Sequence, residues 1–194
     1  MKYCTVLLLV ALSLAACKTK KKKENAEAFF PIASFLKSQV KHIDTSLYRI
    51  VHVEKEGNNP PTKTYLKRED FRKAAEPFLN LPDISTEKWS DDYEESKIFD
   101  PEMNKVILTY TTANKENEIQ REDVVLEQTQ ENSNVQNIII HQVKNEANAT
   151  IVRNMVWYVN KRFTIVTKTT KEGQPERVNT IEVIWNDFID PQTN

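Results

Sequence analysis

Apolar side chains recur every third or fourth residue in two stretches of the first half of the chain, which is the spacing of one helix face. The first stretch follows Pro31, a residue suited to a first helical turn, and runs to Ile43. The second runs from Glu69 to Asn80, where Pro77 should kink or shorten the last turn because it lacks a backbone donor. We therefore expect two amino-terminal helices. Their apolar positions are Ile32, Phe35, Leu36, Val40 and Ile43, then Phe71, Ala74, Ala75, Phe78 and Leu79.

Stretches rich in β-branched and aromatic residues, separated by short polar turns, fill most of the remaining chain. Leu47–Glu54 lies between the helices, and Thr62–Leu66 is a candidate short strand after it. The later candidates are Tyr93–Phe99, Lys105–Thr112, Val124–Gln128, Val135–Val143, Thr150–Asn160, Arg162–Thr170 and Arg177–Trp185. We predict an α+β fold over residues 29–190, a single domain with the two helices packed on a mostly antiparallel, twisted, meander-type sheet of about six to eight strands.

A different pattern occupies the start of the chain. Lys2 precedes an uncharged apolar run from Thr5 to Ala16, which is the arrangement of a secretory signal. As a helix this run would rise only about 18 Å, short of the roughly 30 Å hydrocarbon core of a membrane. The pattern therefore predicts an export segment.

The run ends in Leu14-Ala15-Ala16-Cys17, which resembles the lipobox of bacterial lipoproteins. The resemblance implies that residues 1–16 are a cleaved signal peptide, that the Cys17 thiol carries diacylglycerol, and that the new amino terminus is acylated, for example with palmitate. Two or three acyl chains would hold the protein to a membrane almost permanently. The alternative interpretation is an ordinary signal peptide that contains a cysteine.

Charge is distributed unevenly beyond Cys17. Residues 17–28 carry five lysines and form a predicted basic tether between the lipid and the domain. Without Lys2, those lysines and Glu24, the chain has 21 basic and 27 acidic residues, a net charge of about −6. An acidic domain argues against nucleic acid as a partner.

Composition excludes several kinds of chemistry. Cys4 would be removed with the signal and Cys17 would carry lipid, so the exported domain has no disulfide, thiol nucleophile or cysteine-ligated zinc. Two glycines in the whole chain leave no material for a glycine-rich phosphate loop. We expect no cofactor.

Candidate metal ligands are few. The three histidines, His42, His52 and His141, have no zinc-site spacing and are interpreted as independent imidazoles. The densest acidic run, Asp91, Asp92, Glu94 and Glu95, could offer oxygen ligands to a hard cation but lacks the pattern of a calcium loop. We favour a solvated acidic surface and expect no metal site.

The aromatic residues of the last strands allow two interpretations. Trp157, Tyr158 and Trp185 should lie on neighbouring strands of one sheet. They could fill a core beneath the helices. Alternatively, a curled sheet could hold an apolar ligand against them.

These observations predict an envelope lipoprotein held to a membrane by its lipid anchor, with a binding or assembly role and no enzymatic activity. Lys18 is not the aspartate that marks inner-membrane retention in some lipoprotein families, so we expect the periplasmic face of the outer membrane. An envelope protein is the expected partner. The alternatives are a carrier of lipid or another apolar molecule and, less favoured, a hydrolase in which His52 or His141 meets an acid.

Overall fold

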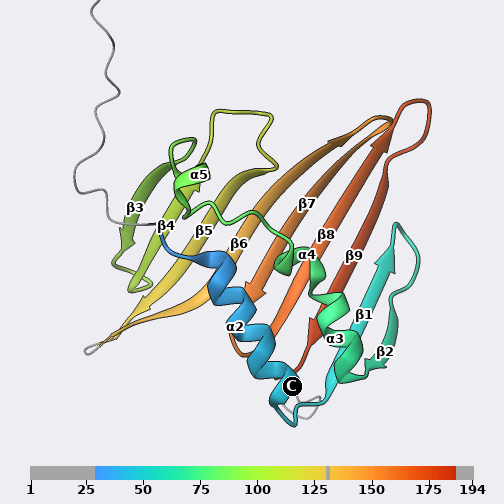
Figure 1. Ribbon diagram of the computed structural model, residues 1–194. Coiled ribbons are helices and arrows are strands. Elements are labelled where there is room, and N and C mark those ends of the chain that lie inside the picture. Colours follow the sequence, from blue (N-terminus) through green and yellow to red (C-terminus); the bar gives the residue numbers. More distant parts are fainter. Residues whose placement is uncertain (1–28, 130–131, 187–194) are drawn as a thin grey trace, which may run out of the picture.

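The computed structural model describes residues 29–129 and 132–186 (Figure 1). The predicted signal peptide, Cys17 and the tether lie outside these residues. The helices are α2 (Ile32–Thr45), α3 (Arg68–Ala74), α4 (Glu76–Leu79) and α5 (Glu87–Ser90). The strands are β1 (Ile50–Glu56), β2 (Thr62–Leu66), β3 (Glu94–Asp100), β4 (Lys105–Thr111), β5 (Ile119–Gln128), β6 (Ser133–Glu146), β7 (Ala149–Tyr158), β8 (Arg162–Lys171) and β9 (Arg177–Ile184).

The strands of the described chain form one antiparallel sheet in the order β2-β1-β9-β8-β7-β6-β5-β4-β3. From β3 to β9 each strand pairs with the next one along the chain, which confirms the predicted antiparallel meander. The prediction of six to eight strands is wrong, because the sheet has nine. Even the short β2 is included, since it pairs with β1 from Leu66 to Thr62.

The helices lie on one face of the sheet (Figure 1). The first predicted helix corresponds to α2, whose buried side chains are the predicted apolar stripe without Phe35 and with Ala33 added. The second is interrupted at Ala75, which separates α3 from α4. Pro77 explains the interruption because its ring excludes the carbonyl four residues earlier, and it fits the first turn of α4 instead.

Arg68 joins α2 to the first strand. Its Nη1 donates to the carbonyl oxygen of Ile43 at 2.7 Å, and its Nη2 donates to that of Tyr48 at 3.0 Å. The last carbonyls of a helix lack partners within the helix and carry partial negative charge. A guanidinium at this position therefore satisfies the end of α2 and fixes where β1 begins.

A cluster of aromatic rings fills the space between the helices and the middle of the sheet. Trp157 and Phe163 stack with ring centroids 5.3 Å apart, and Phe78 of α4 meets the Trp157 ring edge-on at 5.2 Å. Trp185 and Phe71 are buried in the same cluster. Trp157 and Trp185 are thus core residues, and the place where a curled sheet would have held an apolar ligand is occupied by protein.

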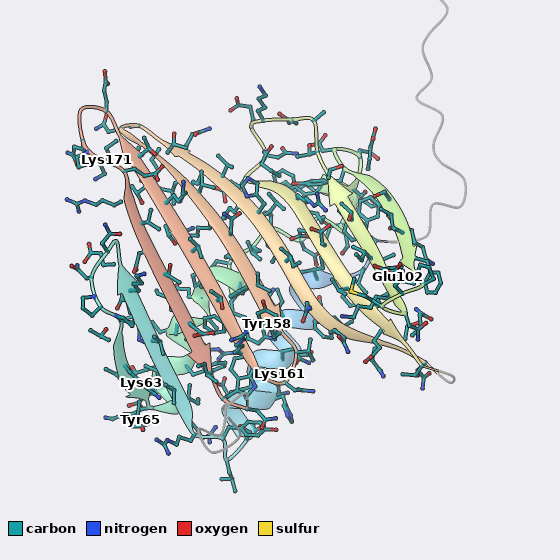
Figure 2. All side chains as sticks on the ribbon, turned by 180° about the vertical axis from the view of Figure 1, so that it is seen from behind. Lys63, Tyr65, Glu102, Tyr158, Lys161 and Lys171 are labelled. Atoms are coloured by element: carbon teal, nitrogen blue, oxygen red, sulfur yellow. The ribbon has the colours of Figure 1, made fainter. Side chains whose placement is uncertain are left out.

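The other face of the sheet, called here the open face, is not covered by any of the described helices (Figure 2). Tyr158 lies on this face, so the sheet separates its side chain from that of Trp157. The guanidinium of Arg162 lies 4.7 Å from the centre of the Tyr158 ring. Ile139, on the same face by strand register, is 37% exposed. Within the described ranges, no helix meets the length and apolarity needed to cross a membrane.

Candidate functional site

A groove of about 480 Å³ opens near the β3 edge of the sheet, on the face that carries the helices. We call it the edge groove. Its apolar walls come from the segment before α2 and from β4 and β5, whereas β3 supplies one acidic and one basic side chain. The lining residues are Phe29, Phe30, Pro31, Ser85, Glu95, Lys97, Leu108, Tyr110 and Leu126.

The segment before α2 forms one wall because it is held on β4. The backbone N–H of Phe30 donates to the Tyr110 hydroxyl oxygen at 3.0 Å, and the ring of Phe29 lies 4.7 Å from that of Tyr110. Phe30 also contacts Phe35 of α2, with ring centroids 5.6 Å apart. These contacts place the first described residues of the chain at the groove.

The sheet register forms the floor. Glu95 pairs with Tyr110, and Lys97 pairs with Leu108. Directly opposed residues of an antiparallel pair point to the same face, so these four side chains stand side by side. The arrangement can accept an apolar group deep in the groove and a polar or charged group at its β3 rim.

A buried carboxyl group lies next to the groove. Glu122 pairs with Tyr110, and its side chain points toward the helices, with 1% of the residue exposed. Its Oε2 has no hydrogen-bond partner in the part of the chain that the structure describes. Burial, followed by the nearby Asp83 carboxylate, raises the pKa of Glu122 to about 8, so the acid is mostly neutral at pH 7.

The two tyrosines beside this carboxyl group are also affected. Burial raises the pKa of Tyr110 to about 12 and raises the pKa of Tyr93 further. The Tyr93 hydroxyl donates to the carbonyl oxygen of Ile119 at 2.7 Å. Both phenols therefore remain neutral and serve as hydrogen-bonding groups in the wall between groove and core.

The three histidines are not brought together. His42 lies on α2 near Tyr48, with ring centroids 6.5 Å apart, and His52 lies on β1 opposite Val183. His141 lies on the open face, where Nδ1 is 2.7 Å from the amide oxygen of Asn154 and must carry the proton of that hydrogen bond. In residues 29–129 and 132–186, no group of histidine, cysteine and acidic side chains is arranged to hold a metal ion.

The acidic run surrounds the start of β3. Asp91, Asp92, Glu94 and Glu95 are all exposed, as expected of a solvated surface. The Oδ2 of Asp92 accepts a hydrogen bond from Asn117 at 3.4 Å, and Glu95 lines the edge groove. The run therefore gives this edge of the sheet its negative charge.

The edge groove and Glu122 were not predicted from the sequence. A signal for Glu122 exists, because alternation along Glu122, Val124 and Leu126 places its side chain on the same face as two apolar neighbours. The groove gives no such signal, since the contact between Phe30 and Tyr110 joins residues 80 positions apart. Comparison with protein-family models, with curated proteins and with solved structures finds no significant match to this chain.

Proposed function

We propose that this protein is a lipoprotein anchored through Cys17 to the periplasmic face of the outer membrane, and that it binds an envelope protein in the edge groove. The observation that carries the proposal is the position of the groove at Phe29 and Phe30. Only 11 residues, 18–28, separate Cys17 from Phe29, and they span at most about 36 Å. A partner in the groove would be held close to the membrane.

The lining chemistry supports a binding role. Apolar walls with a few polar groups at the rim are typical of recognition sites. Within residues 29–129 and 132–186, Glu122 has the one acidic side chain with a raised pKa, but its 1% exposure keeps it from touching a molecule in the groove. Of the two histidines considered for a hydrolase, His52 lies on β1 opposite Val183, and His141 lies on the open face with Asn154 as its partner. These positions favour binding over hydrolysis.

A lipid or another apolar molecule is the second candidate occupant. The groove volume of about 480 Å³ lies within the range of small-molecule sites, roughly 300–1,000 Å³. Leu108, Leu126 and the two phenylalanines would contact an acyl chain. Side chains fill the space around Trp157, so we place such a ligand in the apolar edge groove.

The proposal is tested by capturing the tagged protein from detergent-solubilised membranes and identifying proteins and lipids by mass spectrometry. Leu108→Asn changes the groove floor, and Ile139→Asn is the matched control on the open face. We expect one envelope protein to be enriched with the wild type and the control, and lost with Leu108→Asn. Enrichment of lipid alone supports the carrier role, and unchanged capture by Leu108→Asn rules out the groove.

The anchor is tested separately. Cys17→Ser removes the only thiol of the predicted mature chain. We expect this variant to leave the membrane fraction, and intact-mass measurement of the wild type should show added acyl chains on a chain that begins at Cys17. A variant that still fractionates with membranes would contradict the anchor.

A further inference from the structure

β3 is an edge strand with an exposed apolar surface. Among the described strands it has a neighbour on one side only, and six of its seven residues are exposed. Ile98 is 59% and Phe99 is 55% exposed, one on each face of the sheet. In an edge strand every second residue directs its N–H and C=O groups outward, where another strand can pair with them.

The edge groove adjoins the same strand. Glu95 and Lys97 form its rim, and they point to the helix-bearing face. A strand added outside β3 would place alternate side chains next to these two residues, at the mouth of the groove. Backbone pairing along β3 and side-chain binding in the groove are therefore compatible in one ligand.

Charge distinguishes this edge from the opposite one. Lys97 is the one basic residue between positions 91 and 100, against five acidic residues, Asp91, Asp92, Glu94, Glu95 and Asp100. The opposite edge strand, β2, carries Lys63 as its one charged residue and is followed by Lys67 and Arg68. Figure 2 shows Glu102, in the turn after β3, and Lys63 at opposite edges of the sheet.

We propose that β3 binds an extended segment of the partner protein as an additional antiparallel strand, with apolar side chains alternating with lysine or arginine. This inference rests on the proposed function and specifies the partner chemistry. The apolar side chains enter the edge groove, and the basic ones, which point to the opposite face of the sheet, meet Glu94 and Asp100 of β3. β-strand addition gains affinity from main-chain hydrogen bonds and specificity from alternate side chains.

The test uses the full-length protein and a blocked peptide as long as β3, in which lysine alternates with valine and leucine. Binding is measured by fluorescence anisotropy against a peptide with glutamate in place of lysine. We expect the lysine peptide to bind at least about tenfold more tightly. Reversal of the charge that faces the peptide lysines, by Glu94→Lys, should remove this preference, and Lys63→Glu on β2 should not change it.

Backbone pairing is tested with peptides N-methylated at every second residue, in both phases, because strand addition needs the donors along one peptide edge. One phase should weaken binding at least about tenfold. Bound peptide should also slow hydrogen exchange of alternate β3 amides, and not of β2 amides. Equal binding by both methylated peptides, or no binding of the lysine peptide, overturns strand addition.

The two proposals can fail separately. If Leu108→Asn loses the membrane partner but the lysine peptide does not bind, the groove is supported as the partner site and strand addition is rejected. Peptide binding that is unaffected by Leu108→Asn, with β3 amides protected, retains strand addition and rejects the groove as the partner site.

Discussion

Replacement of the buried Glu122 by glutamine should change how the stability of the protein depends on pH. The wild-type carboxyl group is 1% exposed, its Oε2 lacks a hydrogen-bond partner, and Asp83 adds a second carboxylate nearby. Ionisation inside the fold is therefore unfavourable, and the folded protein keeps this proton to a higher pH than the unfolded chain. Glutamine has a similar shape and no such proton to lose.

The magnitude follows from the two pKa values. The unfolded carboxyl group titrates near pH 4.5, and the folded one near pH 8. Between these values the folded state binds about one more proton than the unfolded state, so each pH unit lowers the free energy of unfolding by about 1.4 kcal/mol. From pH 5 to pH 8 the wild type should lose about 3 kcal/mol through this group. The loss levels off about one pH unit above the folded-state pKa, where both states have lost the proton.

The assay is urea denaturation followed by tryptophan fluorescence, which reports on the buried Trp157 and Trp185. The free energies of unfolding of the wild type and Glu122→Gln are compared at pH 5 and pH 8. The free energy of unfolding of the variant relative to the wild type should be about 3 kcal/mol higher at pH 8 than at pH 5. The cost of burying the amide does not depend on pH, so it does not affect this shift. Glu116→Gln, at an exposed loop position, is the matched control and should show no such shift.

The reasoning is refuted if the stability difference between Glu122→Gln and the wild type is the same at both pH values. That result would mean that the carboxyl group is ionised in the fold and finds a partner, or that the unfolded chain keeps it buried. Direct titration by NMR of the Glu122 carboxyl carbon distinguishes the two, since an ionised group would show its transition well below pH 8.

Three further substitutions test other contacts. Arg68→Met should cost about 2 kcal/mol of unfolding free energy in urea, because the Ile43 carbonyl at the end of α2 and the Tyr48 carbonyl before β1 each lose a charged donor. Phe78→Ala should cost about 3–5 kcal/mol in the same assay, since it leaves a cavity against Trp157. Tyr110→Phe should cost about 1 kcal/mol and speed hydrogen exchange at the Phe30 amide, which loses its acceptor.

Each substitution has a control in which the same type of side chain is replaced at a position that lacks the named contact. Arg72→Met lies on the exposed side of α3, Phe99→Ala removes an exposed ring, and Tyr158→Phe removes a hydroxyl on the open face. All three should stay within about 0.5 kcal/mol of the wild type. A control that costs as much as its partner would show that the named contact is not the cause.

The local elements could be predicted from the sequence because their signals are local. Alternating β-branched residues located the strands from β3 to β9, and Pro77 marked the weak point of the second helix. The pairing of β1 with β9 gave no signal, since the two are far apart in the chain. Each of the nine strands overlaps one of the nine candidate stretches, Thr62–Leu66 included, and the estimate of six to eight was too low because it did not count every candidate.

Most of the candidate site could not be predicted from the sequence, because its residues come together through contacts between distant parts of the chain. Tyr110 looks like an ordinary strand aromatic until Phe29 and Phe30 are placed on it. Glu95 was noticed as part of an acidic run, but its position at a groove depends on its pairing with Tyr110. The raised pKa of Glu122 depends on burial by other segments, which alternation along β5 could suggest but not establish.

The pairing of β1 with β9 constrains the order in which the strands of the sheet can form. Strands from β3 to β9 can form successive hairpins as soon as each is available, because every pairing in that series joins consecutive strands. β1 pairs with β2 early but finds its other neighbour only when β9 arrives, as in the pairing of Val51 with Ile184. Non-local pairing of this kind slows folding. A chain that is synthesised or exported from its amino terminus must therefore leave one edge of β1 unpaired until β9 is available. A chaperone that covers this edge would be most useful during that interval.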